Sequence, residues 1–126
     1  MSSSLTAAPA PGHDGDVAQA PIDLVHLARQ CLGDRALETE LLGLFERQAQ
    51  AIIASLSQMP PRIGIQARAD LAHTLKGSAL AVGARRVAAA AQAYENAAAR
   101  NTAAQIAALQ VAVDEARRAV ASLLAA

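Results

Sequence analysis

The sequence predicts an all-α protein, an up-and-down antiparallel four-helix bundle with a short additional N-terminal helix. Hydrophobic residues make up 53% of the 126 residues but aromatic residues only 2%, so a core must be built from Leu, Ile, Val and Ala. Alanine and leucine are strong helix formers, whereas the aromatic residues that favour strands are scarce. Apolar residues also recur at steps of three and four, and short connections between helices of similar length make neighbours antiparallel.

The first residues differ in composition from the rest of the chain. Residues 1–20 are rich in Ser, Ala, Pro and Gly and show no apolar period, which predicts a flexible tail that includes His13. We expect residues 21–126 to form the folded domain. The N-terminus has neither the basic nor the apolar segment of a secretory signal, and no apolar run approaches the roughly 18–20 residues of a membrane span. A cytoplasmic protein is therefore expected.

Charge and cysteine content restrict the classes of partner. Eleven basic and eleven acidic residues cancel, so no long-range field would draw the protein to nucleic acid or to a membrane surface. The single cysteine, Cys31, has no partner for an internal disulfide and no neighbouring Cys for a metal knuckle. It fits a reducing compartment.

The segment "PIDLVHLARQCLGD" (residues 21–34) predicts the short leading helix, with Gly33 just beyond its end. The residues expected on its apolar face are Ile22, Val25, Ala28 and Leu32. His26 also lies on this helix, and no His or carboxylate stands at a convincing spacing for a shared metal, so we interpret it as a partly exposed structural residue.

A second helix is expected at about 35–58, with Asp34 as its N-cap. The "MPP" run at 59–61 ends it, because proline lacks a backbone donor and disfavours helix in the residue before it. Its predicted apolar stripe consists of Leu37, Leu41, Leu44, Phe45, Ile52 and Leu56.

Three more helices complete the predicted bundle. The third spans about 62–80 and ends in a turn at Gly83, and the fourth is "ARRVAAAAQAYENAAAR", residues 84–100. The fourth is expected to bury Val87, Ala91 and Tyr94. Asn101 or Thr102 caps the fifth, and Thr102 with Gln105 forms a capping-box pattern. The apolar seam of the fifth consists of Ile106, Leu109, Val113, Ala116, Val120 and Leu123.

That seam is typical of either an antiparallel bundle or a coiled coil, so a homodimer through this helix is the alternative. We expect a monomer, because the seam is short and its natural partners lie in the same chain.

The third helix contains an unusual stretch, "AHTLKGSALAVGA", residues 72–84. On a helical wheel the bulky residues Leu71, Leu75 and Val82 lie opposite His73. The residues on the side of His73 are Gln66, Lys76, Gly77 and Leu80. His73 is therefore expected to point away from the core.

This combination suits phosphoryl transfer. A neutral imidazole offers a nitrogen lone pair, and Lys76 supplies positive charge for a transition state that spreads negative charge over the phosphoryl oxygens. Gly77 clears space beside the ring at a helix penalty of about 1 kcal/mol relative to alanine, and Leu80 extends the face for docking. A solitary exposed histidine is also an ordinary surface feature, and close packing of a neighbouring helix would equally explain Gly77.

The position of the turn near residue 84 predicts a hydrogen-bond partner for the His73 imidazole. If the third and fourth helices are antiparallel about residue 84, His73 and Glu95 lie eleven residues on either side of it and come level. The carboxylate would then accept from one ring nitrogen and leave the other free. The alternative is that Glu95 is an ordinary solvated residue.

Residues 72–95, "AHTLKGSALAVGARRVAAAAQAYE", resemble the histidine phosphotransfer (HPt) domain pattern AHxLKGSAxxxGAxxLxxxCxxLE without a gap. The resemblance implies a four-helix bundle in which His73 is phosphorylated, Lys76 compensates charge and Gly77 gives clearance. Glu95 falls where members carry a Gln or Glu that hydrogen-bonds the imidazole. The departures from the pattern are core positions, namely Val87, Ala91 and Tyr94.

The function implied is that of a phosphorelay intermediate, which carries a phosphoryl group on His73 to or from receiver-domain aspartates. It is a carrier with no ATP site and no metal site, and Mg²⁺ is expected in the acidic pocket of the partner receiver. The expected partners are response-regulator receiver domains and a sensor histidine kinase, hybrid kinases included. The residues expected to dock the receiver are Gln66, Ala69, Asp70 and Leu80. Two alternatives remain: a non-phosphorylated adaptor that inhibits a receiver or kinase, and a purely structural helical dimer.

Overall fold

The computed structural model describes residues 20–59 and 64–125, and within them the chain forms five α-helices and no strand. The helices are α2 (Leu24–Gln30), α3 (Arg35–Gln58), α4 (Ile65–Ala81), α5 (Arg85–Asn96) and α6 (Ala103–Ala125). The predicted all-α fold with a short leading helix is confirmed. His13 and all but the last residue of the predicted tail lie outside the described residues.

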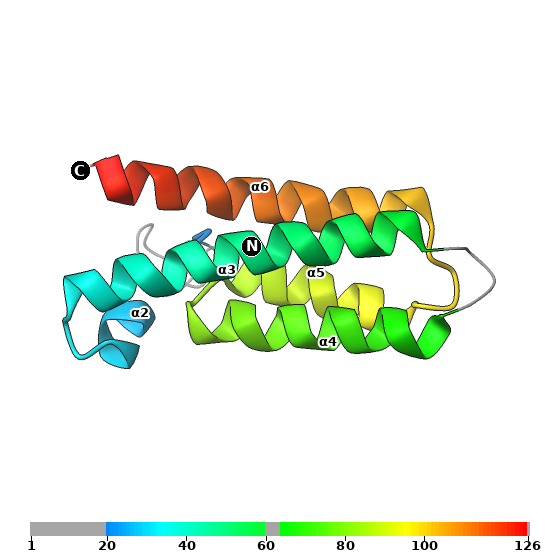
Figure 1. Cartoon of the computed structure of the whole chain (residues 1–126), viewed down its shortest axis with the longest axis horizontal. Helices are drawn as coiled ribbons and strands as arrows, with labels where there is room; N and C mark the ends of the chain where they lie inside the picture. Colours follow the sequence, from blue (N-terminus) through cyan, green and yellow to red (C-terminus); the bar gives the residue numbers. More distant parts are fainter. Residues whose placement is uncertain (1–19, 60–63, 126) are drawn as a thin grey trace, which may run out of the picture.

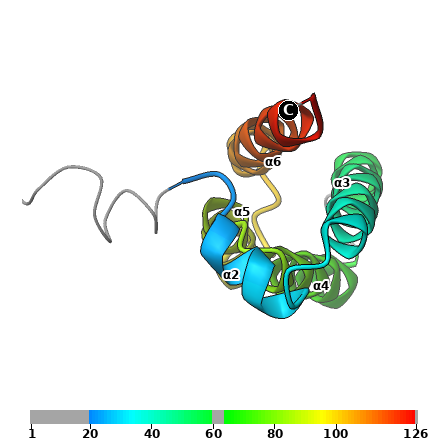
Figure 2. The same ribbon diagram turned by 90° about the vertical axis from the view of Figure 1, so that its left-hand side faces the viewer.

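The four longer helices form an up-and-down bundle. They alternate in direction along its long axis, as Figure 1 shows. Helix α3 packs against α4, α4 against α5, α5 against α6, and α6 back against α3, which closes the bundle. In the end-on view of Figure 2, α2 lies across one end, beside the turn that joins α4 to α5. Each helix therefore has one side turned to its neighbours and one turned to water.

The core is aliphatic, as the composition predicts. Leu75, Leu109 and Leu56 are completely buried, and Tyr94 is one of only two aromatic side chains within it. Several fully buried positions are alanines, which allow close approach of the helices: Ala49, Ala72, Ala79, Ala91 and Ala116. The large share of alanine in the sequence is thus a packing feature as well as a source of helix propensity.

The apolar faces predicted for the first two helices are partly wrong. In α2, Leu27 is buried, whereas Val25 is 54% exposed and Ala28 is also exposed. Leu32 follows the end of α2, has a φ of +52° and is 93% exposed. The helix has only seven residues, so it ends before Leu32 and a longer periodic pattern does not apply to it.

In α3 the buried stripe lies slightly to one side of the predicted one. Leu37 and Leu44 are 38% and 49% exposed, whereas Phe45, Ile52 and Leu56 are buried as expected. The buried residues absent from the prediction are Leu42, Ala49 and Ile53. Apolar residues occur on two adjacent sides of this helix, and periodicity alone does not decide between them.

Helix α5 ends at Asn96, four residues before the predicted end at 100. Alanine would favour continuation, but tertiary contacts replace the helical hydrogen bonds. Gln105 Nε2 donates to the Ala97 carbonyl, at 3.1 Å, and Arg68 Nε donates to the Ala98 carbonyl, at the same distance. These two acceptors are the C-cap residue and the residue after it, so the donors hold the chain where it leaves the helix.

The capping residues predicted for the two longest helices are confirmed. Leu37 N donates to Asp34 Oδ1 over 3.1 Å at the start of α3. At the start of α6, Gln105 N donates to Thr102 Oγ1 over 3.2 Å, while Thr102 N donates to Gln105 Oε1 over 2.8 Å. This reciprocal pair is the capping box that the sequence predicts.

Asp23 fastens α2 to the turn between α4 and α5. Its backbone N–H donates to the Gly83 carbonyl over 2.9 Å, and its carboxylate accepts from His26 N and from Arg85 Nη2, at 3.1 and 3.0 Å. These bonds lower the pKa of the Asp23 carboxyl, chiefly through the backbone donor of His26, although burial opposes the shift. The short helix is therefore an integral part of the bundle.

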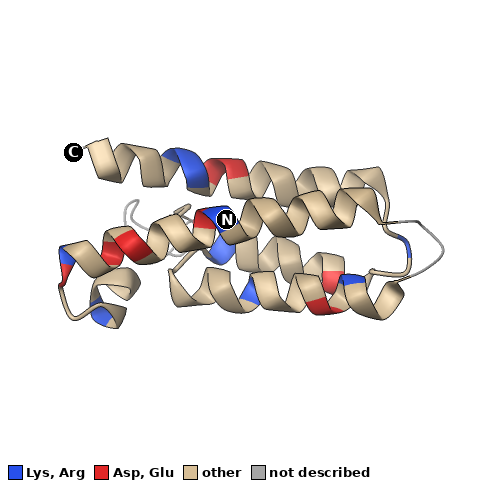
Figure 3. Cartoon of the chain, in the orientation of Figure 1, with Lys and Arg blue, Asp and Glu red and all other residues tan. Residues whose placement is uncertain are grey.

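Charges are distributed over the bundle rather than collected on one face. Figure 3 shows basic and acidic segments side by side on several helices. Among the described residues, Arg117 pairs with Glu46 at 3.2 Å and Arg86 with Glu115 at 3.1 Å, and each of these ion pairs joins different helices. Within the part of the chain that the structure describes, no helix combines the length and apolarity needed to cross a lipid bilayer.

Candidate functional site

The water-facing side of α4 carries the sequence-predicted site. The His73 side chain is 70% exposed, in agreement with the helical-wheel prediction. Behind it, Ala72 and Leu75 are completely buried, and Leu71 is half-buried against the core. The amphipathic pattern of α4 thus buries the neighbours of His73 and leaves the imidazole accessible.

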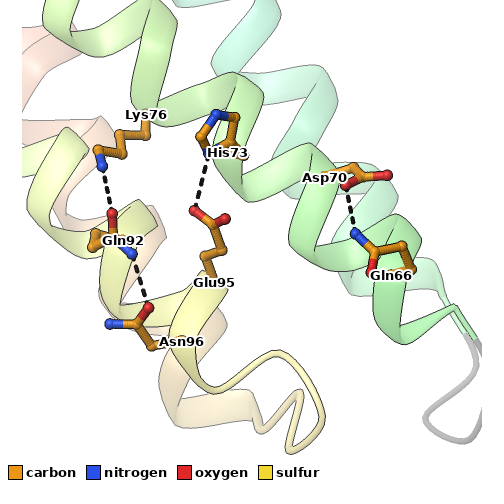
Figure 4. Close-up of polar contacts among 7 residues, drawn as sticks. All are labelled: Gln66, Asp70, His73, Lys76, Gln92, Glu95 and Asn96. Atoms are coloured by element: carbon orange, nitrogen blue, oxygen red, sulfur yellow. Dashed lines mark hydrogen bonds and ion pairs between the residues drawn. The ribbon is translucent and has the colours of Figure 1, made fainter.

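Glu95 on α5 lies level with His73, as the distance from the turn predicts. Its Oε1 atom is 3.3 Å from His73 Nδ1, and the two side chains face each other across the helix pair in Figure 4. A carboxylate only accepts hydrogen bonds, so this contact assigns the proton to Nδ1. The lone pair of the neutral ring is then on Nε2, the nitrogen that Glu95 does not contact.

A second contact joins the same two helices one turn further along. Lys76 Nζ donates to Gln92 Oε1 over 2.5 Å, and Gln92 Nε2 donates to Asn96 Oδ1 over 2.8 Å (Figure 4). Gln92 and Asn96 are not among the site residues that the sequence predicts. The signal was available: Lys76 and Gln92 lie eight residues on either side of position 84, just as His73 and Glu95 lie eleven.

Gly77 has an ordinary helical environment. A Cβ built on it would meet no atom within 4 Å, apart from its own helix backbone and chain neighbours, and its φ is not positive. Close packing of a neighbouring helix, the alternative explanation, therefore does not apply to this glycine. The absent side chain leaves open space on the face that carries His73.

The residues predicted for receiver docking lie along α4 on both sides of His73. Gln66 and Asp70 are exposed and bonded to each other, Nε2 to Oδ1 at 2.8 Å, as Figure 4 shows. Leu80 is 46% exposed, whereas Ala69 is half-buried and packs partly against the core. The face therefore offers polar groups on one side of the imidazole and an apolar group on the other.

Arg68 is a buried charged residue on α4 that the sequence pattern does not predict. Its side chain is completely buried, and its Nε bonds the Ala98 carbonyl beyond the end of α5. Tyr94 lies in the same region, and burial raises the pKa of its hydroxyl. That hydroxyl donates to Asn101 Oδ1. This buried polar cluster fixes the end of α5 on which Glu95 is placed.

Other chemistry-bearing residues do not join this face. His26 is half-buried on α2, and among the described residues its Nε2 has no hydrogen-bond partner. Cys31 is buried, and burial raises the pKa of its thiol, which disfavours the nucleophilic thiolate. In the described ranges, no three His, Cys, Asp or Glu side chains are grouped so that they could hold a metal ion.

Comparison with known proteins supplies the family. The family model of the Hpt domain matches residues 40–126, which include α4, α5 and α6 and most of α3. Comparisons with curated proteins and with solved structures give no match. The match covers more than half of the chain and agrees with the all-helical bundle and with the pattern around His73. The chain therefore belongs to the Hpt domain family, whose domains serve phosphotransfer in phosphorelays and interact there with receiver domains and kinases.

Proposed function

We propose that His73 accepts a phosphoryl group from a receiver-domain aspartyl phosphate or a histidine kinase and passes it to another receiver aspartate. One observation carries this proposal. The imidazole is 70% exposed and contacts Glu95 through Nδ1, so Nε2 is directed away from that contact and accessible to a visiting domain. We further propose that the receiver docks over Gln66, Ala69, Asp70 and Leu80.

The transfer step balances without a proton acceptor. The Nε2 lone pair forms the N–P bond while the P–O bond to the aspartate breaks, and its electron pair returns to the carboxylate. Nδ1 keeps its proton, so the ring gains positive charge as the bond forms. The Glu95 carboxylate stabilises this charge, as the acidic residue does for histidine in a catalytic triad. The reverse step returns the phosphoryl group by the same route.

Lys76 and Gly77 assist the same step in different ways. Lys76 follows His73 by three residues and lies on the same side of α4, where its ammonium group can offset charge on the phosphoryl oxygens. Gly77 provides open space for the approach of the receiver, since nothing occupies the position of its missing Cβ. Mg²⁺ would be supplied by the acidic pocket of the receiver.

A transfer assay tests this assignment. The full chain is mixed with Mg²⁺ and with ³²P-phosphorylated receiver domains from the same genome, and the label on the protein is measured before and after acid treatment. We expect acid-labile label on the wild type and on His26→Gln, the matched histidine control, and none on His73→Gln.

Label on His73→Gln would contradict the assignment. Wild-type protein that binds the receiver but gains no label would instead support the inhibitory adaptor. If substitutions of His73, Lys76 and Gly77 left the function of the protein unchanged, the structural dimer would be favoured.

A further inference from the structure

Lys76 does not extend freely into water. It is half-buried, and its ammonium group donates to the side-chain amide of Gln92 on the neighbouring helix, at 2.5 Å (Figure 4). We propose that Gln92, oriented by Asn96, is a positioning residue that holds the Lys76 ammonium group beside His73 without neutralising it. This inference rests on the proposed function and assigns a role to Gln92, which stands at an unspecified position of the HPt pattern, and to Asn96, which follows the pattern.

A lysine that serves phosphoryl transfer needs a fixed position. Its charge lies at the end of a flexible four-carbon side chain, and each free rotamer reduces the time that the ammonium group spends near the phosphoryl oxygens. Binding to a neighbouring helix removes part of this freedom before the receiver arrives. Catalytic groups that are held in place in advance are more effective than groups that must be ordered during the reaction.

The chemical nature of the acceptor matters as much as its position. Gln92 Oε1 is a neutral amide oxygen, so it orients the ammonium group and leaves its positive charge uncompensated. A carboxylate in the same place would pair with Lys76 and repel an incoming phosphoryl group. The contact at His73 has the opposite arrangement, because there a carboxylate faces the ring that becomes positively charged.

Asn96 determines which end of the Gln92 amide faces Lys76. Gln92 Nε2 donates to Asn96 Oδ1 over 2.8 Å, and the residues are four apart on α5. With its nitrogen engaged in this way, Gln92 presents its oxygen to Lys76. If the amide were reversed, its N–H groups would face the ammonium group and repel it. Asn96 thus acts on Lys76 through Gln92.

The test compares Gln92→Ala and Gln92→Glu with the wild type in single-turnover transfer from the ³²P-labelled receiver. Receiver affinity is measured separately by calorimetry. We expect transfer at saturating receiver to fall several-fold for Gln92→Ala and about tenfold or more for Gln92→Glu, with affinity changed less than about twofold. The double variant Gln92→Glu/Glu95→Gln keeps the net charge and moves the carboxylate from His73 to Lys76. It should be at least as slow as Gln92→Glu.

Gln110→Ala is the matched control. Gln110 is also half-buried, and its Nε2 also donates to a residue four positions later, Asp114, at 2.8 Å, but it lies on α6. Ala107→Glu, at an exposed position of the same helix, controls for one added negative charge. Both controls should transfer at the wild-type rate. Equal slowing in a control and in the corresponding Gln92 variant, or an unchanged rate in Gln92→Glu, would overturn the inference.

A spectroscopic measurement separates this inference from the proposed function. In ¹⁵N NMR spectra at low temperature, a held Lys76 ammonium group exchanges its protons slowly and gives a distinct signal. We expect this signal in the wild type and in Gln110→Ala, and its loss in Gln92→Ala. If the wild type accepted no phosphate, the proposed function would fail, but the signal would still decide whether Gln92 holds Lys76. A signal that persisted in Gln92→Ala would overturn the positioning role.

Discussion

Two glycines of the same helix–turn segment, Gly77 and Gly83, occupy opposite environments. Gly83 is buried with a φ of +77°, and a Cβ built on it would lie 2.9 Å from the backbone oxygen of Asp23. Gly77 is exposed, and its Cβ would meet nothing within 4 Å. The fold explains the first glycine fully and does not explain the second. A glycine that weakens a helix without a packing reason is consistent with the clearance role that we propose for Gly77.

The charged pairs beside these glycines differ in the same way. Asp23 has a side chain that is only 8% exposed and pairs with Arg85, and together they fasten α2 to the turn. His73 and Glu95 have side chains that are 70% and 27% exposed, and they lie on an open face. Similar residue types thus join α2 to the turn at one end of the α4–α5 pair and form, in its middle, the open pair to which we assign phosphoryl transfer. Exposure distinguishes the two uses.

The largest effect on stability is expected for Gly83→Ala. It should destabilise the protein by about 2–4 kcal/mol, because alanine is strained at positive φ and its Cβ collides with Asp23. Gly77→Ala is the matched control and should stabilise the protein by about 0.5–1 kcal/mol, the helix preference of alanine over glycine. Urea unfolding measures both. Equal responses of the two variants would remove the distinction between the glycines.

Gly77→Glu tests whether the open position of this glycine matters for phosphoryl transfer. The free energy of unfolding should stay within about 0.5 kcal/mol of the wild-type value, because the site is open to water. Phosphoryl transfer should slow by about tenfold or more, which corresponds to about 1.4 kcal/mol, since the added carboxylate crowds and repels the incoming group.

Ala67→Glu adds the same charge at an exposed position near the start of α4 and should leave transfer unchanged. Transfer at the wild-type rate in Gly77→Glu would contradict the clearance role of Gly77.

A further prediction concerns the buried pair of Asp23 and Arg85 and depends on pH. Asp23→Asn keeps a residue that can cap α2 but removes the charge, and should cost about 1–2 kcal/mol at pH 7. The folded pKa of Asp23 is below its ordinary value of 3.8, so its contribution is present above pH 3.8 and is lost as pH falls through the lower, folded pKa. The wild type and Asp23→Asn should therefore converge in acid.

Asp34→Asn is the control, since Asp34 is an exposed cap that makes no ion pair among the described contacts. Its cost should stay within about 0.5 kcal/mol at pH 7. A difference between wild type and Asp23→Asn that persisted unchanged at low pH would show that the charge of Asp23 does not fasten the turn.

The sequence predicts the features that follow from helix geometry. The exposure of His73 follows from the wheel of α4, and the level position of Glu95 follows from its distance to the turn. Both depend only on regular helices and one tight turn. The capping box of Thr102 and Gln105 is equally local, because it depends on residues three apart.

The features that were missed depend on tertiary contacts. Leu27 replaces Val25 in the core because α2 is too short for its period to define a face. The early end of α5 depends on Arg68, a residue about thirty positions earlier that bonds Ala98. Gln92 is different, because its distance from residue 84 pairs it with Lys76 just as the distance of Glu95 pairs it with His73. An uncharged side chain does not by itself indicate a functional contact.

The fastening of α2 by Asp23 has a consequence for how this domain can be cut or transplanted. The Hpt match begins at residue 40, inside α3, whereas the contacts that cover Gly83 come from Asp23, which lies before the match. An excision at the start of the match would split a helix and uncover the hairpin that presents the imidazole. A transferable segment must therefore include the residues that make these hydrogen bonds, and the residues matched by the family model are only part of it.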